Sequence, residues 1–507
     1  MFELAGLSKR FEGNFLMENA CQKIILKLSG PFSQNSNHNS VQLAVGVSRI
    51  YTGIIIFTQA IGNFGIVPIF EDLPQRVAFE QLMVSLCGVM LAVGFLTPIA
   101  LLFLIYSFTF SDLSLSLGCQ VARILLLGLV LLRSGKIYSL DEYFCSKFST
   151  LNKVLYCVGI DSKPSISFNW LKFGLMVLFW GICLSAMIFH FQDKSWLSGE
   201  VLSVALTGSF YSKYSGFFRS LADNYPQAFC FFCISGLIVQ AFWESFLVSL
   251  MFLRFGKYFV IFQGVAFFLC SIIIFELQFL PFFEVGLWLL LFGNFVFCRS
   301  NAVSDFDQKF VRSAFFAGLV MVFFTICFLV VLVFKPDFLN NLNSSKFKKI
   351  TNLGFKLFGQ GPVSVFNKDD LSADEFYMVI YELDENGNRI RCVPYFDADG
   401  NRLRYMRNDL ICYRLAIPWH RLDKNQKFLN EQEKKPTDAS SKVFKSIAFL
   451  DAKLQKRNGW VHYEAEIYER HIETTFFLSR WKESKKITEW NLELNLPESS
   501  APVFLWP

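Results

Sequence analysis

Charged residues are scarce in this chain. Only 18% of its 507 residues are Asp, Glu, Lys or Arg, whereas 53% are hydrophobic. A soluble domain is usually about 25% charged, so this composition argues against a wholly soluble protein. The net charge of +6 is modest and the basic residues are scattered, and we therefore expect no nucleic-acid partner.

The short motifs that mark common soluble enzymes are also missing. The sequence has no GxSxG, P-loop, HExxH or dinucleotide-binding fingerprint. Its tail histidines lack metal-ligand spacing, since His462 and His471 are nine residues apart, and no metal site is expected. Cys230 and Cys233 form a CxxC inside an apolar run. Two buried thiols are the favoured interpretation there, because metal and redox chemistry needs thiolates.

Long apolar runs, by contrast, are abundant. Stretches such as QLMVSLCGVMLAVGFLTPIALLFLIYSF are too long for a core helix, and about 20 such residues cross a bilayer. The sequence therefore predicts a polytopic α-helical membrane bundle of about nine spans, followed by a small α+β, β-rich soluble domain. We find no internal repeats, which speaks against a transporter. The spans are expected at 43–66, 78–96, 98–117, 119–133, 170–190, 227–253, 258–276, 281–298 and 313–334.

The orientation of the bundle follows from its basic connections. Lysine and arginine recur in the connections 134–168, 254–257 and 299–312, which nine spans place on one side. By the positive-inside rule these connections and the N-terminal segment 1–42 are cytoplasmic. That segment lacks a short apolar stretch with a cleavage site, so no signal peptide is expected. The tail and the connection 191–226 then lie outside, beyond a bacterial inner membrane or on a lumenal side.

Four regions follow from these patterns. Residues 1–42 form a cytoplasmic segment, and 43–334 form the membrane domain. Residues 335–374 are polar with scattered glycines and are interpreted as a linker. Residues 375–507 form the extracytoplasmic domain, because this tail is much richer in charge than the rest of the chain.

The tail shows strand, turn and helix signals. Asn386-Gly387 and Asp399-Gly400 predict hairpins with type I′ turns, since both residue pairs tolerate positive φ. The apolar spacing over 440–459 predicts a helix, and the alternation in WVHYEAEIYE predicts a strand over 460–469. Cys392 and Cys412 could pair if their compartment is oxidising and their Cα atoms lie within about 7 Å.

Ionisable residues inside the spans are candidate functional residues, because burying charge in lipid is costly. Glu244 lies deepest and could pair with Arg123, or could serve only as a hydrogen-bonding group in the bundle. Arg49 begins a span and is interpreted as reaching back to the interface. Glu276 and Glu284 flank a short turn and are expected to be solvated.

The stretch HFQDKSWLSGE interrupts the apolar pattern at the outer end of the fifth span. His190 suits proton transfer near neutral pH, and Asp193 and Lys194 follow within reach of it if the helix continues. These three are the candidate catalytic residues. The alternative is a polar end to the span, with Trp196 as an interfacial anchor.

Three stretches also resemble a known family. SRIYTGIIIFTQAIGNF over 48–64, GKIYSLDEYF over 135–144 and SAMIFHFQDKSWLSGEVL over 185–202 resemble, in order, segments of the vitamin K-dependent γ-carboxylase superfamily. The membrane part of that superfamily is called the HTTM domain. Trp196 and Gly199 match its third segment. The resemblance implies an HTTM-like bundle over about 42–300, with an outer β-rich domain.

The match is weaker at the catalytic positions. In the carboxylase, catalysis is attributed to a Lys in the fifth-span segment and to a His before the fourth span. The Lys position corresponds here to His190 or Phe191, and residues 107–118 contain no His, with Asp112 the nearest polar group. We therefore do not expect true glutamate carboxylation. A quinone or a vitamin K-like hydroquinone as cofactor is implied by the resemblance alone.

Two functions remain open on the sequence. One is a carboxylase-like enzyme with changed chemistry, in which His190 acts as acid or base on a quinone, a lipid-like molecule or an exported protein. It predicts a cavity beside His190. The other is a non-catalytic membrane protein that uses its outer domain to recognise a lipid, quinone or protein partner. It predicts that His190 faces headgroups or solvent. Trp196, Gly199, Glu244 and Arg123 are the candidate binding residues in either case.

Overall fold

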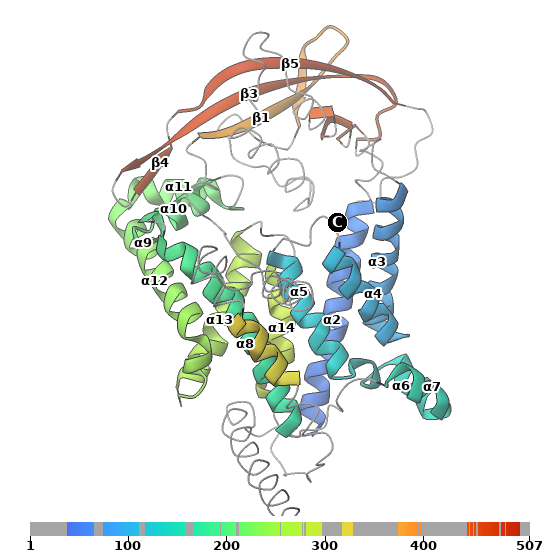
Figure 1. Cartoon of the computed structure of the whole chain (residues 1–507). Coiled ribbons are helices and arrows are strands. Elements are labelled where there is room, and N and C mark those ends of the chain that lie inside the picture. Colours follow the sequence, from blue (N-terminus) through green and yellow to red (C-terminus); the bar gives the residue numbers. More distant parts are fainter. Residues whose placement is uncertain are drawn as a thin grey trace, which may run out of the picture.

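The fold is known from a computed structural model of the whole chain. It describes residues 38–64, 75–110, 117–157, 166–192, 194–208, 212–253, 255–275, 277, 280–296, 317–327, 374–393, 396, 444–445, 447–449, 451–452, 455–475, 478–481 and 483–496. Helices form a bundle, and an antiparallel sheet lies across one end of it (Figure 1). The longer helices are α2 (His38–Phe64), α3 (Gln75–Val93), α4 (Thr97–Phe110), α5 (Leu117–Leu131), α8 (Ile166–Gln192), α12 (Pro226–Leu250), α13 (Gly256–Ile274) and α14 (Leu280–Val296).

The bundle is partly as expected. Each of the nine predicted spans overlaps a helix, the last one at 317–327. Four described helices are long and apolar enough to cross a membrane, over 40–58, 169–188, 226–250 and 256–274. The remaining apolar helices are shorter, at 82–93, 97–110, 118–131, 280–295 and 317–327. A mostly helical chain with four candidate spans is therefore shown, and the count of nine spans is not confirmed.

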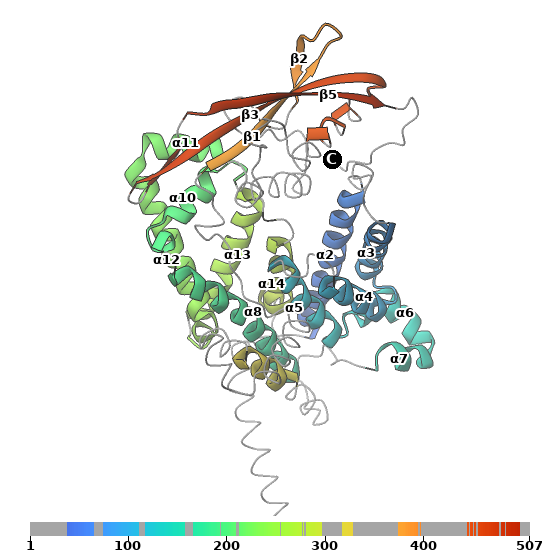
Figure 2. The same cartoon turned by 45° about the horizontal axis from the view of Figure 1, so that its top comes forward.

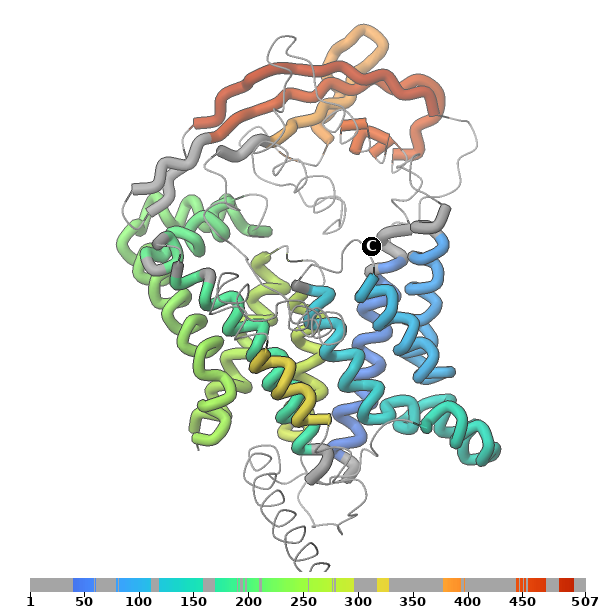
Figure 3. The backbone as a smooth tube through the Cα atoms, in the orientation of Figure 1, coloured from blue at the N-terminus to red at the C-terminus, as the bar shows by residue number. Residues whose placement is uncertain are grey.

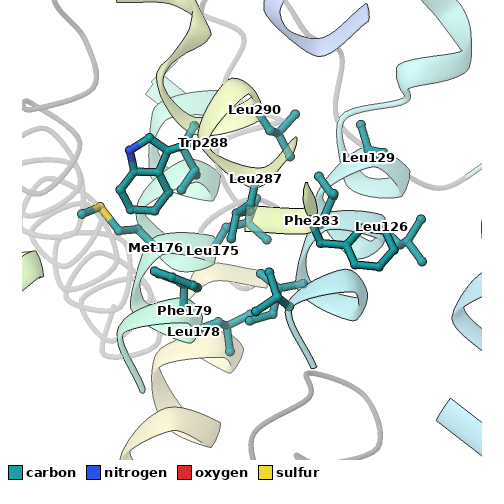
Figure 4. Close-up of a cluster of buried hydrophobic side chains, with 14 of the residues drawn as sticks. Leu126, Leu129, Leu175, Met176, Leu178, Phe179, Phe283, Leu287, Trp288 and Leu290 are labelled. Atoms are coloured by element: carbon teal, nitrogen blue, oxygen red, sulfur yellow. The ribbon is translucent and has the colours of Figure 1, made fainter. Parts of the chain in front are cut away.

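The bundle core lies where α5, α8 and α14 meet. Figure 4 shows leucines of α5 against Leu175 and Phe179 of α8 and against Phe283 and Leu287 of α14. All of these side chains are at most a few per cent exposed. Small residues allow closer approach elsewhere, since a Cβ at Gly53 of α2 would lie 2.4 Å from the backbone N of Ala92. Figure 3 shows the resulting pair of α2 and α3 side by side.

Arg49 of α2 holds the end of α3. Its guanidinium is fully buried and donates to the carbonyls of Leu91 and Ala92 at 2.6 and 3.0 Å, and to those of Ile137 and Tyr138 at 3.3 and 2.8 Å. The last carbonyls of a helix have no partner within it, and the negative end of its dipole favours a cation. Arg49 therefore caps α3, and the expectation that it reaches back to the interface was wrong.

Asp141 completes the same corner from the other side. This buried carboxylate accepts the backbone N–H groups of Leu96 and Thr97 at 2.7 and 2.8 Å, and the hydroxyl of Tyr156 at 2.7 Å. Thr97 begins α4, where free N–H groups favour an anion. Arg49 and Asp141 thus fix the turn from α3 to α4. We refer to these two residues and the backbone groups that they bind as the corner.

Short helices lie at both ends of the bundle. η3 (Ser134–Lys136), α6 (Leu140–Lys147) and α7 (Ser149–Leu155) project at the end away from the sheet. At the other end lie α9 (Lys194–Leu197), α10 (Glu200–Thr207) and α11 (Ser215–Asn224). Both α10 and α11 contact the sheet (Figure 2). The described helices of the connection 191–226 therefore lie at the same end of the molecule as the sheet.

The tail sheet is antiparallel and centred on one long strand. Its strands are β1 (Asp374–Leu383), β2 (Arg389–Cys392), β3 (Gly459–Thr475), β4 (Leu478–Trp481) and β5 (Lys485–Leu496). The order is β2-β1-β3-β4, and β5 also pairs with β3. The predicted strand over 460–469 is confirmed within β3. Within the range of the predicted helix, residues 444–445, 447–449 and 451–452 are helical, whereas 455–458 are not and lead into β3.

The first predicted hairpin is present, with a different turn. β1 and β2 pair around Asp384–Asn388, where the N–H of Asp384 donates to the carbonyl of Asn388 at 2.9 Å. Only Gly387 of this turn has positive φ, at 79°, whereas a type I′ turn requires two such residues. The Asp384 carboxylate instead accepts the N–H groups of Asn386 and Asn388, which favours a longer loop. Asp399, Gly400 and Cys412 lie outside the described residues, so the second hairpin and the disulfide stay predictions.

The two faces of the sheet differ. On one face, Tyr463, Ala465 and Ile467 of β3 pack against the helical residues Phe444 and Ile447. On the other face, carboxylates alternate with cations. Glu466 accepts from Arg389 and from Lys486, each at 2.6 Å, and these cations also bind Glu464 and Glu489 at 2.7 and 2.8 Å. The three carboxylates lie close together, but because two cations already pair with them the group does not favour a metal ion.

This charged face predicts a pH-dependent stability of the tail. Burial raises the pKa of Glu466, but hydrogen bonds from Lys486, Arg389 and Tyr468 outweigh burial and lower the pKa from 4.5 to about 2. A folded-state pKa below the unfolded one stabilises the fold fully above about pH 4.5, and this stabilisation is lost as the pH falls through about 2. We expect Glu466→Gln to remove about 1–2 kcal/mol at pH 6, allowing for solvent screening of the partly exposed cations.

Hydrogen exchange of β3 and β5 in the full-length protein measures this effect. The difference between Glu466→Gln and the wild type should shrink between pH 6 and pH 3. Glu493→Gln, at a side chain that is 67% exposed, is the matched control and should show little change. A pH-independent difference would mean that Glu466 acts by packing rather than by charge.

Candidate functional site

A cavity of about 550 Å³ opens among the helices next to the sheet end. It is lined by α8, α9, α10, α12 and α13 and by the beginning of α14. Its walls are mainly apolar and aromatic, with few polar side chains. This volume and this lining are typical of a small-molecule site in a protein.

His190 and Trp196 form one wall of the cavity. Their rings stack with centroids 3.5 Å apart and planes 14° apart, and both side chains are at most 8% exposed. His190 lies two residues before the end of α8. Trp196 belongs to α9, which follows α8 and places the indole against the His190 ring. Trp196 packs with Leu237 of α12 as well. The interpretation of Trp196 as an interfacial anchor was therefore wrong, because it belongs to the wall of the cavity.

Gly199 sets the course of the chain after this wall. It has φ of 79°, a conformation that favours glycine, and it joins α9 to α10. A Cβ at this position would lie 2.8 Å from Cγ1 of Ile234 on α12. Gly199 thus positions the wall rather than lining the cavity. Asp193 and the side chain of Lys194 lie outside the described residues, so their predicted roles stay untested.

Carboxyl groups form the polar end of the cavity. Glu244 of α12 accepts a hydrogen bond of 2.5 Å at its Oε1 from Nε2 of Gln240, and both residues line the cavity. Glu284 of α14 also lines it and is only 6% exposed. Glu244 and Glu284 therefore reach the same cavity from two different helices. The expectation that Glu284 is solvated was wrong, and Glu276 lies outside the described residues.

Arg123 does not join this cluster. It is fully buried in α5, where its Nε donates to the carbonyl of Cys119 at 3.2 Å. Among the described side chains there is no ion pair between Arg123 and Glu244, although the sequence left that pairing open. Gln240 is the partner that sequence reasoning missed. Its spacing of four residues from Glu244 on one helix was the available signal, since such residues share a face.

The cavity reaches the apolar surface of the bundle. Four of the residues that line it are also exposed: Phe232, Gly236, Val239 and Cys270. They belong to α12 and α13, the candidate spans with the least buried surface, each 28% buried. Glu244 lies further along α12 from the wall of His190 and Trp196, because it follows Leu237, which packs with Trp196, by seven residues or about 10 Å of helix. A ligand could therefore enter sideways between α12 and α13 and extend to the carboxyl groups.

Comparison with known proteins gives no relative. No family model, no curated protein and no solved structure matches this chain.

Proposed function

We propose that this chain is an integral membrane protein that binds a lipid-soluble ligand, a quinone or lipid-like molecule, in the cavity beside His190. One observation carries the proposal: a mainly apolar cavity joins the surface of two candidate spans to the buried His190, the buried Glu284 and the half-buried Glu244. In this proposal His190 is the acid or base, since imidazole exchanges protons near neutral pH. The tail lies on the outer side, and the shorter apolar helices complete nine spans.

The proposal keeps the resemblance to the γ-carboxylase superfamily as an argument about the fold of the bundle, and not about its chemistry. Two of its three stretches meet in the corner, where Arg49 and Asp141 bind backbone groups. Their residue pattern therefore has a structural reason that involves no substrate. Only the third stretch, with His190 and Trp196, borders the cavity. We infer that the resemblance supports an HTTM-like bundle more strongly than it supports carboxylation.

Filling the cavity should remove the bound ligand. Ala266 of α13 lines the cavity, whereas its neighbour Val265 is 42% exposed on the outer surface. We expect Ala266→Trp to reduce a co-purifying lipid-soluble molecule by at least about tenfold, because a buried indole occupies the space of the ligand. Val265→Trp, the matched control, should retain it. Mass spectrometry of solvent extracts from detergent-purified protein, scaled to protein amount, measures the difference.

His190→Ala separates two roles in the same experiment. It removes the imidazole without filling the cavity. A ligand that is lost from both His190→Ala and Ala266→Trp is held by the wall of His190 and Trp196. A ligand that His190→Ala retains is held elsewhere in the cavity, and the role of His190 is then limited to proton exchange with it. Equal retention by wild type, Ala266→Trp and Val265→Trp would contradict the proposed function.

A further inference from the structure

Two acceptor atoms that face the cavity have no donor within hydrogen-bond distance in the part of the chain that the structure describes. They are Oε2 of Glu244 and Oε1 of Gln240, and both atoms are buried. Glu284, 94% buried, accepts no hydrogen bond from the described residues and lines the same cavity. Buried polar atoms are nearly always hydrogen-bonded in folded proteins. The three groups together therefore indicate a ligand that supplies donors.

The cluster also has no cation of its own. Among the described residues that line the cavity there is no lysine or arginine, and His190 stands at the wall beside Trp196. Carboxyl groups that line a mainly apolar cavity are costly to ionise without a positive partner, because an apolar site disfavours the charged form. A positively charged ligand would relieve this cost for both groups.

We propose that the ligand is a cationic amphiphile whose primary ammonium head binds between Glu244 and Glu284. An ammonium group has three N–H donors and no acceptor, which matches the acceptors of Glu244, Gln240 and Glu284. A hydroxyl head has one donor and leaves two of these acceptors without a hydrogen bond. The apolar tail then lies along the aromatic walls toward Phe232 and Val239. This inference rests on the proposed function, because it names the class of molecule that the cavity takes.

Three probes of equal chain length test the head group. Decylamine, decyltrimethylammonium and decanol are titrated at equal mole fractions into the full-length protein in detergent, and bound probe is counted after gel filtration. We expect decylamine to bind at least about tenfold more tightly than decanol. Decyltrimethylammonium should fall between them, because it keeps the charge and loses the three N–H donors.

Isosteric variants test the residues. Glu284→Gln should weaken decylamine binding by at least about tenfold and leave decanol binding within about twofold. Glu244→Gln should also weaken decylamine binding. Testing both variants means that the result does not depend on a single variant that fails to fold. Glu142→Gln, at an exposed carboxylate of α6, is the matched control and should change neither. Matching gel-filtration profiles of the variants and the wild type establish that the variants are folded, which the comparison requires.

The outcomes separate the two proposals. Equal binding of decylamine and decanol by the wild type, or unchanged decylamine binding by both Glu→Gln variants, would overturn the ammonium head while leaving the cavity as a lipid site. Binding of no probe by the wild type, together with equal ligand content in Ala266→Trp, would overturn the proposed function itself.

Discussion

Arg49→Met should cost the helical bundle about 3–5 kcal/mol, because each buried carbonyl left without a donor costs about 1–3 kcal/mol before the corner relaxes. The four carbonyls that Arg49 binds, on Leu91, Ala92, Ile137 and Tyr138, would lose their donor in a buried corner. Two of them end α3, so the helix would also lose a cation at the negative end of its dipole. We expect a much lower yield of monodisperse protein and a clearly lower thermal midpoint of what remains.

The corner explains why methionine cannot compensate. The methionine side chain would fill much of the volume of the arginine side chain, but it donates no hydrogen bond. The surrounding backbone is packed too closely to move far toward the carbonyls. Gly94 follows α3 with φ of 71°, and a Cβ there would lie 2.5 Å from Nη1 of Arg49. The chain is therefore packed tightly around the guanidinium, and water has little space to replace it.

Lys153→Met is the control for the loss of a positive charge. Lys153 is exposed on α7, at the same end of the bundle, and its replacement removes one cation without breaking a buried contact. Thermal unfolding of both variants in one detergent, followed by gel filtration, compares them directly. If Arg49→Met matched Lys153→Met, water would be solvating the carbonyls and the cap would contribute little.

Arg49 also shows where sequence reasoning stops. A charged residue at the start of an apolar helix is most simply interpreted as reaching the interface, and nothing nearby in the sequence contradicts that. Its partners lie 42 to 89 residues away. Only the close packing of α2 on α3, through Gly53, brings them within reach. The identity of the helix was predictable, and the role of its arginine depended on contacts far along the chain.

In the candidate site too, one residue could be predicted from the sequence and another could not. His190 could be singled out because it interrupts an apolar pattern, and the structure places it in the cavity. Glu284 was misjudged because it lies near a turn, where side chains are commonly solvated. Leu280, which begins α14 four residues before Glu284, lies against α5, since a Cβ at Gly118 of α5 would lie 3.4 Å from its backbone N. Nearness to a turn in sequence therefore did not imply nearness to water.

In the tail, local patterns were more informative. The alternation of β3 was predictable because one of its faces is buried against a helix, so apolar residues recur at every second position. The position of the first turn was predictable from Asn386-Gly387. Its type was not, because the Asp384 carboxylate, rather than the favoured dipeptide, organises the loop. Strand β5 carries a similar alternation over 485–496 and was the signal that went unused.

Asp451→Ala should destabilise the tail by about 3 kcal/mol and leave the bundle unchanged. Asp451 is fully buried between the helical residues and the sheet, where it pairs with Arg391 and accepts the hydroxyl of Tyr463 at 3.1 Å. Arg391 also binds Glu382 at 2.7 Å, so the aspartate connects three elements. Its removal leaves the buried phenol of Tyr463 without this acceptor and the half-buried guanidinium of Arg391 with Glu382 alone, which is the costly way to break such a network.

Hydrogen exchange distinguishes a local effect from a global one. A loss of about 3 kcal/mol corresponds to about 100-fold faster exchange for amides that exchange when the tail opens, and these should fall in β1, β3 and β5. Amides of α5 and α8 should keep the wild-type rate, because their core shares no residue with that of the tail. Glu385→Ala, at an exposed residue of the first turn, should leave both sets unchanged. Faster exchange in α5 and α8 as well would mean that sheet and bundle unfold together, and that the contacts of β4 with α10 and α11 couple the tail to the wall of the cavity.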